Sequence, residues 1–426
     1  MKAKALLLLL SFTLAACITA FAQQDDQITD PSYLSNNAHV MSGQAIAPRG
    51  GRNGQAHARF GISGVDSIPN FNQHFQANGI DPYGNPQVIW YTNTVGNPPA
   101  LGGTTSINAP IIPVSLDLRN ADGSIRYVNG QRLYYDATQY AALAAGSPVF
   151  QNASWSTSNA PTQITDAIQR AEYWSTMRPD WHTLLATNTN TTPQVMILLK
   201  GTYRFALNAD GSCCRYVLVD ANTFGNALFP PTYPVDNTTV IGSAELNGDI
   251  TTKSISTLLF PNTFLYLNGN PSDCCVLGYH TFDYEPGIAS NGNLPRFYVV
   301  NYSSWISPGL FGGGFADDTA ISHEVAELFN DPFVTFDNIH DITPFWKSPN
   351  GNCQDGLEVG DVIEGLPQGV YPITMPNGHL YHPQNEALWQ WFAFRAPSTA
   401  FQAAYSYPNT ATLTSLSAPQ KFNCGQ

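Results

Sequence analysis

Runs of apolar and β-branched residues recur along the chain, separated by polar connections rich in glycine and proline. Runs of this length, bounded by turn-forming residues, are typical of β-strands. The predicted strands cover residues 87–93, 111–119, 194–201, 215–221 and 296–305. The run at 194–201 is expected to be a buried strand, because its apolar residues follow one another without alternation.

Two segments have the 3.6-residue period of a helix instead. In residues 165–177, Ile168, Ala171 and Trp174 share one apolar face, and the charged side chains lie elsewhere. A second helix of three to four turns is expected in residues 319–331, between a run of capping residues and a proline.

The predicted strands do not alternate strictly with helices, so we expect an α+β fold with a mixed β-sheet and long loops. The chain has 426 residues, of which 43% are hydrophobic and 12% are charged, a composition typical of a globular protein with a sizeable core. Residues 23–85 are polar and rich in Gly, Asn and Gln, and are expected to form an extended lead-in. No change of composition marks a linker after residue 86, so residues 86–426 are expected to form a single large domain.

The first residues have the pattern of an export signal. Two lysines precede an apolar stretch, residues 5–16, that is too short to span a bilayer comfortably. We expect residues 1–22 to be removed as a signal peptide, because the Ala-Phe-Ala before Gln23 is the small-x-small pattern of ordinary secretion. The alternative is the lipobox that ends at Cys17, which would leave a lipoprotein anchored through that cysteine. Either route predicts a secreted or periplasmic protein.

The formal net charge of the chain is −13. A chain this acidic is repelled by phosphate backbones and by anionic lipid headgroups, so nucleic acid is excluded as an expected partner. Association with a membrane is expected only through a lipid on Cys17.

Six cysteines follow Cys17, namely Cys213, Cys214, Cys274, Cys275, Cys353 and Cys424. An even number in an exported chain predicts disulfide bonds. The spacing, two adjacent pairs and two single residues, does not fit a zinc–thiolate site. Because a bridge between adjacent cysteines is strained, we expect each pair to bond to cysteines elsewhere, with the connectivity left open.

The second predicted helix contains Ser-His-Glu-Val-Ala-Glu, which matches the zinc-protease motif H-E-x-x-H except that Glu327 occupies its fifth position. His323 and Glu327 are four residues apart, so their side chains leave the same face of the helix. A carboxylate oxygen is an acceptable zinc ligand, and Glu324 would lie beside a metal-bound water. The alternative is a solvated helix face on which His323 and Glu327 form an ordinary i, i+4 pair.

A tetrahedral metal site needs a third protein ligand. Residues 352–365 supply four acidic candidates, namely Asp355, Glu358, Asp361 and Glu364. Glu358 is flanked by two apolar residues, so it alternates like a residue on a half-buried strand. We favour Glu358 as the third ligand for that reason.

The pairing of this helix with Leu-Glu-Val-Gly-Asp-Val-Ile-Glu-Gly about 30 residues later resembles the EXORDIUM, or phosphate-induced, protein family and its secreted microbial relatives. The likeness covers residues 322–365, and residues 274–280 are similar to a Cys-rich stretch ahead of that helix. The sequence departs from the plant pattern at Ile363, where that pattern has a cysteine, and Cys353 is the candidate to replace it.

This resemblance implies a zincin-like α+β domain for residues 86–426. In the matching positions, His323 and Glu327 are the metal ligands of the helix, and Glu324 is the catalytic glutamate. Glu358 and Asp361 match the two acids of the family's E-x-G-D segment, which implies that they also bind the metal.

Together these features predict an exported zinc metallopeptidase-like hydrolase that acts on a peptide or cell-surface substrate. Zinc lowers the pKa of a bound water, and Glu324 would take the proton and pass it to the leaving amine. A carboxylate such as Glu327 donates more negative charge to zinc than an imidazole does, which weakens this activation. The alternative is therefore a non-catalytic secreted protein with a structural site for zinc or calcium, binding cell-wall material or a signalling partner.

Other candidate residues are expected to be structural. His280 could reach the metal site, but a single histidine among aromatic residues is more often part of a core. Residues 309–315 are rich in glycine but lack the Lys-Ser/Thr of a phosphate loop, so they are expected to form a flexible lip beside the cleft. Residues 389–394 are aromatic and expected in the core, with a carbohydrate-binding platform as the alternative. Three histidines in polar loops are expected at the surface, namely His340, His379 and His382.

Overall fold

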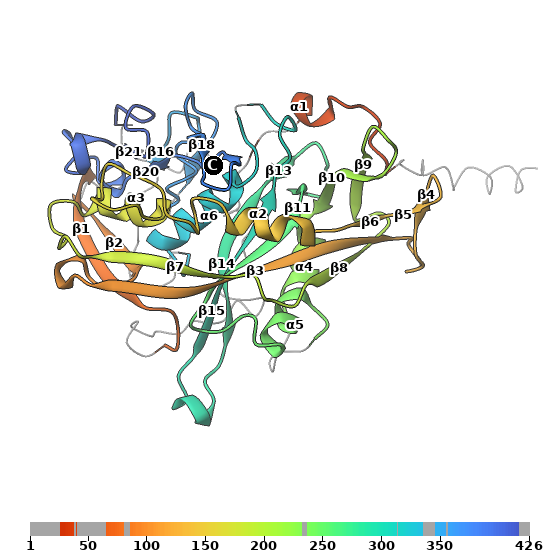
Figure 1. The fold of residues 1–426 in the computed structure, drawn as a ribbon, viewed down its shortest axis with the longest axis horizontal. Helices are drawn as coiled ribbons and strands as arrows, with labels where there is room; N and C mark the ends of the chain where they lie inside the picture. The colour runs from red at the N-terminus through yellow and green to blue at the C-terminus, as the bar shows by residue number, and fades with distance from the viewer. Residues whose placement is uncertain are drawn as a thin grey trace, which may run out of the picture.

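The structure is a computed structural model that describes residues 26–37, 40, 65–80, 86–231, 237–312, 314–334, 346–354 and 357–416. It is a mixture of β-sheets and short helices, which confirms the predicted α+β class (Figure 1). The expected signal peptide lies outside the described residues, as do Cys17, His340, Asp355 and Cys424.

The central sheet has seven strands: β3 (Thr104–Arg119), β6 (Tyr134–Tyr135), β7 (His182–Asn188), β8 (Gln194–Leu199), β11 (Ile255–Pro261), β14 (Gly278–Glu285) and β15 (Arg296–Trp305). A second sheet has four strands: β9 (Tyr203–Leu207), β10 (Cys213–Asp220), β12 (Thr263–Tyr266) and β13 (Cys274–Val276). Two-stranded pairs complete the described strands: β1 (Asn70–Ile80) with β2 (Pro86–Val95), β4 (Tyr127–Val128) with β5 (Gln131–Arg132), β16 (Trp346–Lys347) with β17 (Cys353–Gln354), β18 (Ile373–Thr374) with β19 (Leu380–Tyr381), and β20 (Glu386–Ala387) with β21 (Ser406–Tyr407).

The described α-helices are α1 (Tyr33–Asn37), α2 (Ala141–Ala145), α3 (Ile164–Glu172), α4 (Ala221–Leu228), α5 (Val240–Leu246), α6 (Thr319–Asn330) and α7 (Trp389–Phe392). Of these, α6 is the longest and carries the H-E-x-x-E motif. No helix in the described part of the chain has both the length and the apolar character needed to cross a bilayer.

The central sheet is mixed, as predicted. Its strand order is β14-β15-β11-β3-β6, with β7 and β8 paired to β3. Strand β11 runs parallel to both β15 and β3, whereas β14 runs antiparallel to β15. The two strands at this end, β14 and β15, form the floor on which α6 packs.

Successive residues of the central strands face opposite sides of the sheet, so one strand supplies two cores. In β11, Leu259 belongs to the core that contains α3, α6 and α7, and Leu258 belongs to the core that contains α4 and α5. Figure 1 shows this division, with α6 and the C-terminal segments (blue) on one side of the sheet and α4 and α5 on the other. The motif helix therefore lies between the sheet and the C-terminal segments.

Two local predictions are wrong. Strand β8 is not fully buried, because it packs on one face only, and Val195 and Ile197 on its other face are each 47% exposed. Helix α3 ends at Glu172 rather than at residue 177. Trp174 therefore lies beyond the apolar face of the helix, 48% exposed, and its indole N–H donates to the Thr399 carbonyl.

The folded part of the chain begins before residue 86. Strand β1 pairs antiparallel with β2, placing Asn70 opposite Val95. Further upstream, the Ile28 N–H donates to the Phe205 carbonyl at 2.7 Å, and Asp26 forms an ion pair with Arg126. The polar composition of residues 23–85 gave no sign of these contacts. They consist of backbone hydrogen bonds and one ion pair, which do not need a run of apolar residues.

The adjacent cysteines are bonded to each other, as Cys213–Cys214 and Cys274–Cys275, so the expectation of longer-range pairing is wrong for both pairs. The topology explains why the two pairs do not reach one another. They lie on β10 and β13, which are separated by β12. Two strand spacings are about 9.6 Å, beyond the roughly 7 Å between Cα atoms that a disulfide can bridge.

Candidate metal centre

Helix α6 is buried along its whole length, which contradicts the alternative of a solvated helix face. Its apolar residues Ile321, Val325 and Leu328 pack into the core beside the sheet. Its polar residues His323 and Glu327 are also buried, because the turn that follows Leu357 covers them. Burial of a histidine and a carboxylate is costly unless they find partners, so the surroundings of this face decide what the site can do.

Two glycines allow this close packing. A Cβ at Gly360 would lie 2.6 Å from Nδ1 of His323, and a Cβ at Gly278 would lie 2.6 Å from Oε1 of Glu324. Both distances are too short for real atoms, so any larger residue would displace the neighbouring side chain. The turn and strand β14 therefore approach α6 only because these positions have no side chain.

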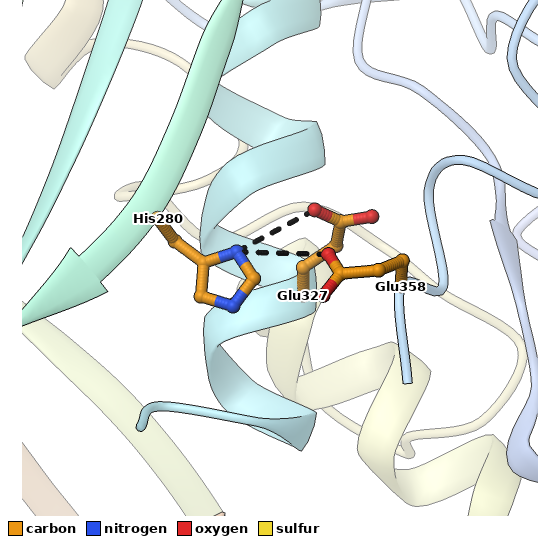
Figure 2. A group of neighbouring side chains, drawn as sticks. All are labelled: His280, Glu327 and Glu358. Carbon is orange, nitrogen blue, oxygen red and sulfur yellow. Dashed lines mark ion pairs between the residues drawn. The ribbon is translucent and has the colours of Figure 1, made fainter. Parts of the chain in front are cut away.

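One group of potential ligands consists of His280, Glu327 and Glu358, whose ligand atoms all lie within 4.8 Å of one another. His280 comes from β14, Glu327 from α6 and Glu358 from the turn, and Figure 2 shows the two carboxylates facing the imidazole. Nδ1 of His280 is 3.5 Å from Oε2 of Glu327 and 3.9 Å from Oε2 of Glu358. Neither oxygen of Glu358 has a hydrogen-bond partner among the described residues.

The tautomer of His280 follows from its other nitrogen. Nε2 lies 3.1 Å from the carbonyl oxygen of Asp331, which can only accept a hydrogen bond. Nε2 therefore carries the proton, and in the neutral ring Nδ1 presents a lone pair to the carboxylates. A ring oriented in this way by a backbone carbonyl is the usual arrangement of a metal-binding histidine.

A second group consists of His323, Glu324 and Glu327. Nε2 of His323 is 3.3 Å from Oε1 of Glu327 and 3.5 Å from Oδ1 of Asp361. Nδ1 of His323 is 3.3 Å from Oε1 of Gln384, whose amide N–H₂ donates to the Gly360 carbonyl. The Gln384 oxygen therefore accepts from Nδ1, and Nε2 of the neutral ring offers its lone pair to the acids.

These separations fit shared coordination better than direct hydrogen bonding. Hydrogen bonds between nitrogen and oxygen are mostly 2.7–3.2 Å long, and charged pairs are shorter still. Two ligand atoms of one tetrahedral zinc ion lie about 3.4 Å apart, given bond lengths near 2.1 Å. The separations of each imidazole from Glu327 and of His323 from Asp361, 3.3–3.5 Å, are close to that value, and the separation of His280 from Glu358 is longer, at 3.9 Å. The buried histidines and acids could therefore hold a metal ion.

Burial and neighbouring charges shift the pKa values of the buried acids and histidines of the centre. Burial raises the pKa of Glu358, and the negative charges of Glu327 and Asp361 raise it further. Burial also raises the pKa of Glu324, to about 7. Burial opposes the charge on His280, but the carboxylates outweigh it and raise the pKa of the imidazole to about 10. Without a cation, the centre therefore retains protons that metal binding would release.

Glu327 differs from the other acids. Burial acts to raise its pKa, but the two imidazoles outweigh this and hold it below the ordinary value. Its Oε1 also accepts the backbone N–H groups of Gly360 and Asp361, at 3.1 and 3.2 Å. Glu327 is therefore held both ionised and oriented in the centre.

A pocket opens onto the second group. Its lining consists of Leu277, Gly278, Phe315, Thr319, Ala320, His323, Glu324, Glu364 and Gln384. The cavity measures about 10 Å³, room for a single water molecule. Phe315, at the end of the glycine-rich segment expected to border the cleft, forms part of its wall.

The structure brings together the predicted residues His323, Glu324, Glu327, Glu358 and Asp361. One of the two expected acids lies beside His323, but it is Asp361 rather than the favoured Glu358, which faces His280 instead. The reason is local: Leu357 and Glu358 are irregular and a turn follows from Val359, so every second residue need not face the same side, and Leu357 and Val359 are as buried as Glu358.

The sequence argument placed His280 in the core without a role, and it overlooked Gln384 and Glu386. Glu386 is fully buried, with neither oxygen paired among the described residues, and burial raises its pKa. The available signal at His280 was a histidine between aromatic residues in a predicted core, because a buried polar residue requires a partner.

The remaining candidates are structural. His379 and His382 face Asp317, at 3.6 and 2.6 Å, and are partly exposed. Trp391 and its neighbours in α7 are buried in the core, which contradicts a carbohydrate-binding platform there. Comparison with protein-family models, with curated proteins and with solved structures found no match for the chain.

Proposed function

We propose that this chain is an exported metal-dependent hydrolase with a zincin-like site that cleaves peptide bonds. The observation that carries the proposal is the geometry around His323: its free nitrogen faces Glu327 and Asp361 at ligand-to-ligand distances, and Glu324 lies beside it on the pocket wall. The resemblance to the EXORDIUM family and export through residues 1–22 belong to the same proposal.

The proposed chemistry divides the roles among neighbouring side chains. His323, Glu327 and Asp361 would hold a zinc ion, which would supply Lewis acidity and lower the pKa of a water when bound. Glu324 would act as the general base toward that water and pass the proton to the leaving amine.

The size of the pocket bears on the substrate. Its present volume admits water but no peptide. A peptide or cell-surface substrate would therefore have to displace part of the wall, on which Phe315 and Leu277 are the large apolar side chains.

A second candidate is a non-catalytic protein whose metal is structural, with cell-wall material or a signalling partner as its ligand. The specific observation in its favour is the burial of the centre, where His323 at 7% is the most exposed of the five predicted residues. Several carboxylates around one ion would also neutralise its charge and suit calcium as well as zinc.

The test is a pair of assays on the wild type, Glu324→Gln and the metal-free control His323→Ala. The account predicts that Glu324→Gln keeps its zinc and its fold but cleaves a broad peptide library about 10² to 10⁴ times more slowly. Cleavage that survives in Glu324→Gln would remove this residue as the base and overturn the mechanism. Zinc binding with no cleavage by the wild type would favour the structural candidate instead.

A further inference from the structure

A single ion at His323 leaves half of the centre without a function. His280 and Glu358 are buried, their ligand atoms face one another, and Glu358 has no hydrogen bond within the described structure. We propose that the centre holds two divalent cations bridged by Glu327. One ion lies among His323, Glu327 and Asp361, and the other lies among His280, Glu327 and Glu358. The inference rests on the proposed metal site, but not on the proposed reaction.

The carboxylate of Glu327 has the geometry of a bridge. Its Oε1 is 3.3 Å from Nε2 of His323, and its Oε2 is 3.5 Å from Nδ1 of His280. The two backbone N–H groups that donate to Oε1 fix the plane of the carboxylate. Each oxygen is therefore presented to a different imidazole, and each can bind a different ion.

The two imidazoles belong to separate ligand groups. The ligand atoms of His280, Glu327 and Glu358 lie within 4.8 Å of one another, and so do those of His323, Glu324 and Glu327, so Glu327 is common to both groups. Asp361 adjoins the second group through its Oδ1, which is 3.5 Å from Nε2 of His323. Each ring also has its own outer acceptor, the Asp331 carbonyl for His280 and the Gln384 amide oxygen for His323. Both rings are thus oriented as ligands. A single ion at either position would bind only one of them.

The charge of the buried site also favours two ions. Glu324, Glu327, Glu358 and Asp361 surround the two imidazoles and are all buried. Two divalent cations offset more of the negative charge of these buried carboxylates than one does. Because each position combines one imidazole with carboxylate oxygens, the donor set suits Zn²⁺, Mn²⁺ or Fe²⁺.

Two metal ions bridged in this way are a known arrangement for hydrolysis, in which one ion activates water and the other holds a substrate oxygen. Glu324 lies near both positions, since its Oε2 is 3.7 Å from Nδ1 of His280 and the residue also belongs to the His323 group, which suits the role of a base for either ion's water.

The test is the zinc stoichiometry of the full chain after removal of metal with a chelator and titration with Zn²⁺. The wild type is expected to bind two zinc ions, and His280→Ala and Glu358→Gln are expected to bind one each. Glu358→Gln keeps the shape of the side chain, so it tests the site even if His280→Ala fails to fold. His379→Ala is the matched control and is expected to bind two. Loaded with Mn²⁺, the wild type should give the electron paramagnetic resonance spectrum of a coupled pair, and Glu358→Gln that of an isolated ion.

The outcomes separate the two proposals. One zinc per chain in the wild type, unchanged in Glu358→Gln and lost in His323→Ala, would overturn the second site and leave the proposed function standing. Absence of zinc binding by the wild type would overturn both. Two zinc ions in the wild type with an uncoupled Mn²⁺ spectrum would contradict the Glu327 bridge.

Discussion

The absence of a side chain at Gly360 allows the turn to lie close to α6. The His323 ring lies against this position, and the backbone N–H of Gly360 donates to Glu327. One residue thus sets both the distance of the turn from α6 and the orientation of the central carboxylate. Gly278 has the same effect on the opposite side, against Glu324.

Gly360→Ala is therefore expected to push the His323 ring out of place and to weaken zinc binding about 10- to 100-fold, the cost typical of disturbing a ligand's supporting contacts. Zinc titration of the folded variant is the measurement. Gly225→Ala is the matched control, because an added Cβ there meets no atom within 4 Å. Equal zinc affinity in Gly360→Ala and the wild type would show that the close contact has no influence on the ligand.

The sequence predicts the position of some residues of the centre but not of others. The four-residue spacing of His323 and Glu327 predicts a shared face, since that face depends only on helix geometry. The partnership of His280 with Glu358 could not be predicted, because the two residues are 78 positions apart in the chain and meet only through tertiary packing. The preference for Glu358 over Asp361 beside His323 failed because it assumed strand alternation in a segment that is not a strand.

At the scale of elements, α6 is the scaffold of the centre and its surroundings fix its position. It packs on β14 and β15 and contacts α3. Glu172, the last residue of α3, is buried, and its Oε1 accepts the N–H of Trp389 at the start of α7 at 3.4 Å. Helix α7, in turn, packs in the same core as α6. The buried carboxyl group of Glu172 thus lies where α3 and α7, the two helices that share a core with α6, meet.

Glu172 predicts a pH dependence of stability. Burial raises its pKa from 4.5 to about 8. Below about pH 4.5, Glu172 is protonated in both the folded and the unfolded state, so its ionisation does not change the free energy of unfolding. As the pH rises toward 8, the unfolded chain ionises and the folded chain does not, so stability falls by up to about 3 kcal/mol at pH 7.

Glu172→Gln should remove this loss, so the variant should gain stability relative to the wild type between pH 5 and pH 7.5. Urea unfolding at several pH values measures the difference. Asp122→Asn is the control, because Asp122 is an exposed acid whose pKa is lowered by its hydrogen bonds to Ser124, and it does not titrate in this range. A difference between Glu172→Gln and the wild type that is the same at pH 5 and pH 7.5 would contradict the prediction.

At the scale of the whole molecule, one mixed sheet separates two cores and brings distant segments to one helix. The fold class followed from the lack of strict strand–helix alternation, and the strands β2, β3, β10 and β15 followed from their apolar runs. Strand order did not follow, because β3 pairs with strands from four other parts of the chain. The cysteine pairing was also missed, since it depends on which strands lie between the pairs.

The central claim is that the buried histidines and acids form a metal centre, and Glu327 is the residue common to every part of it. The most direct measurement is elemental analysis of the purified full chain beside Glu327→Gln, both exposed to zinc and then dialysed. The account predicts bound zinc in the wild type and almost none in Glu327→Gln, with both proteins folded. A wild type that holds no zinc, or a Glu327→Gln protein that holds as much as the wild type, would contradict it.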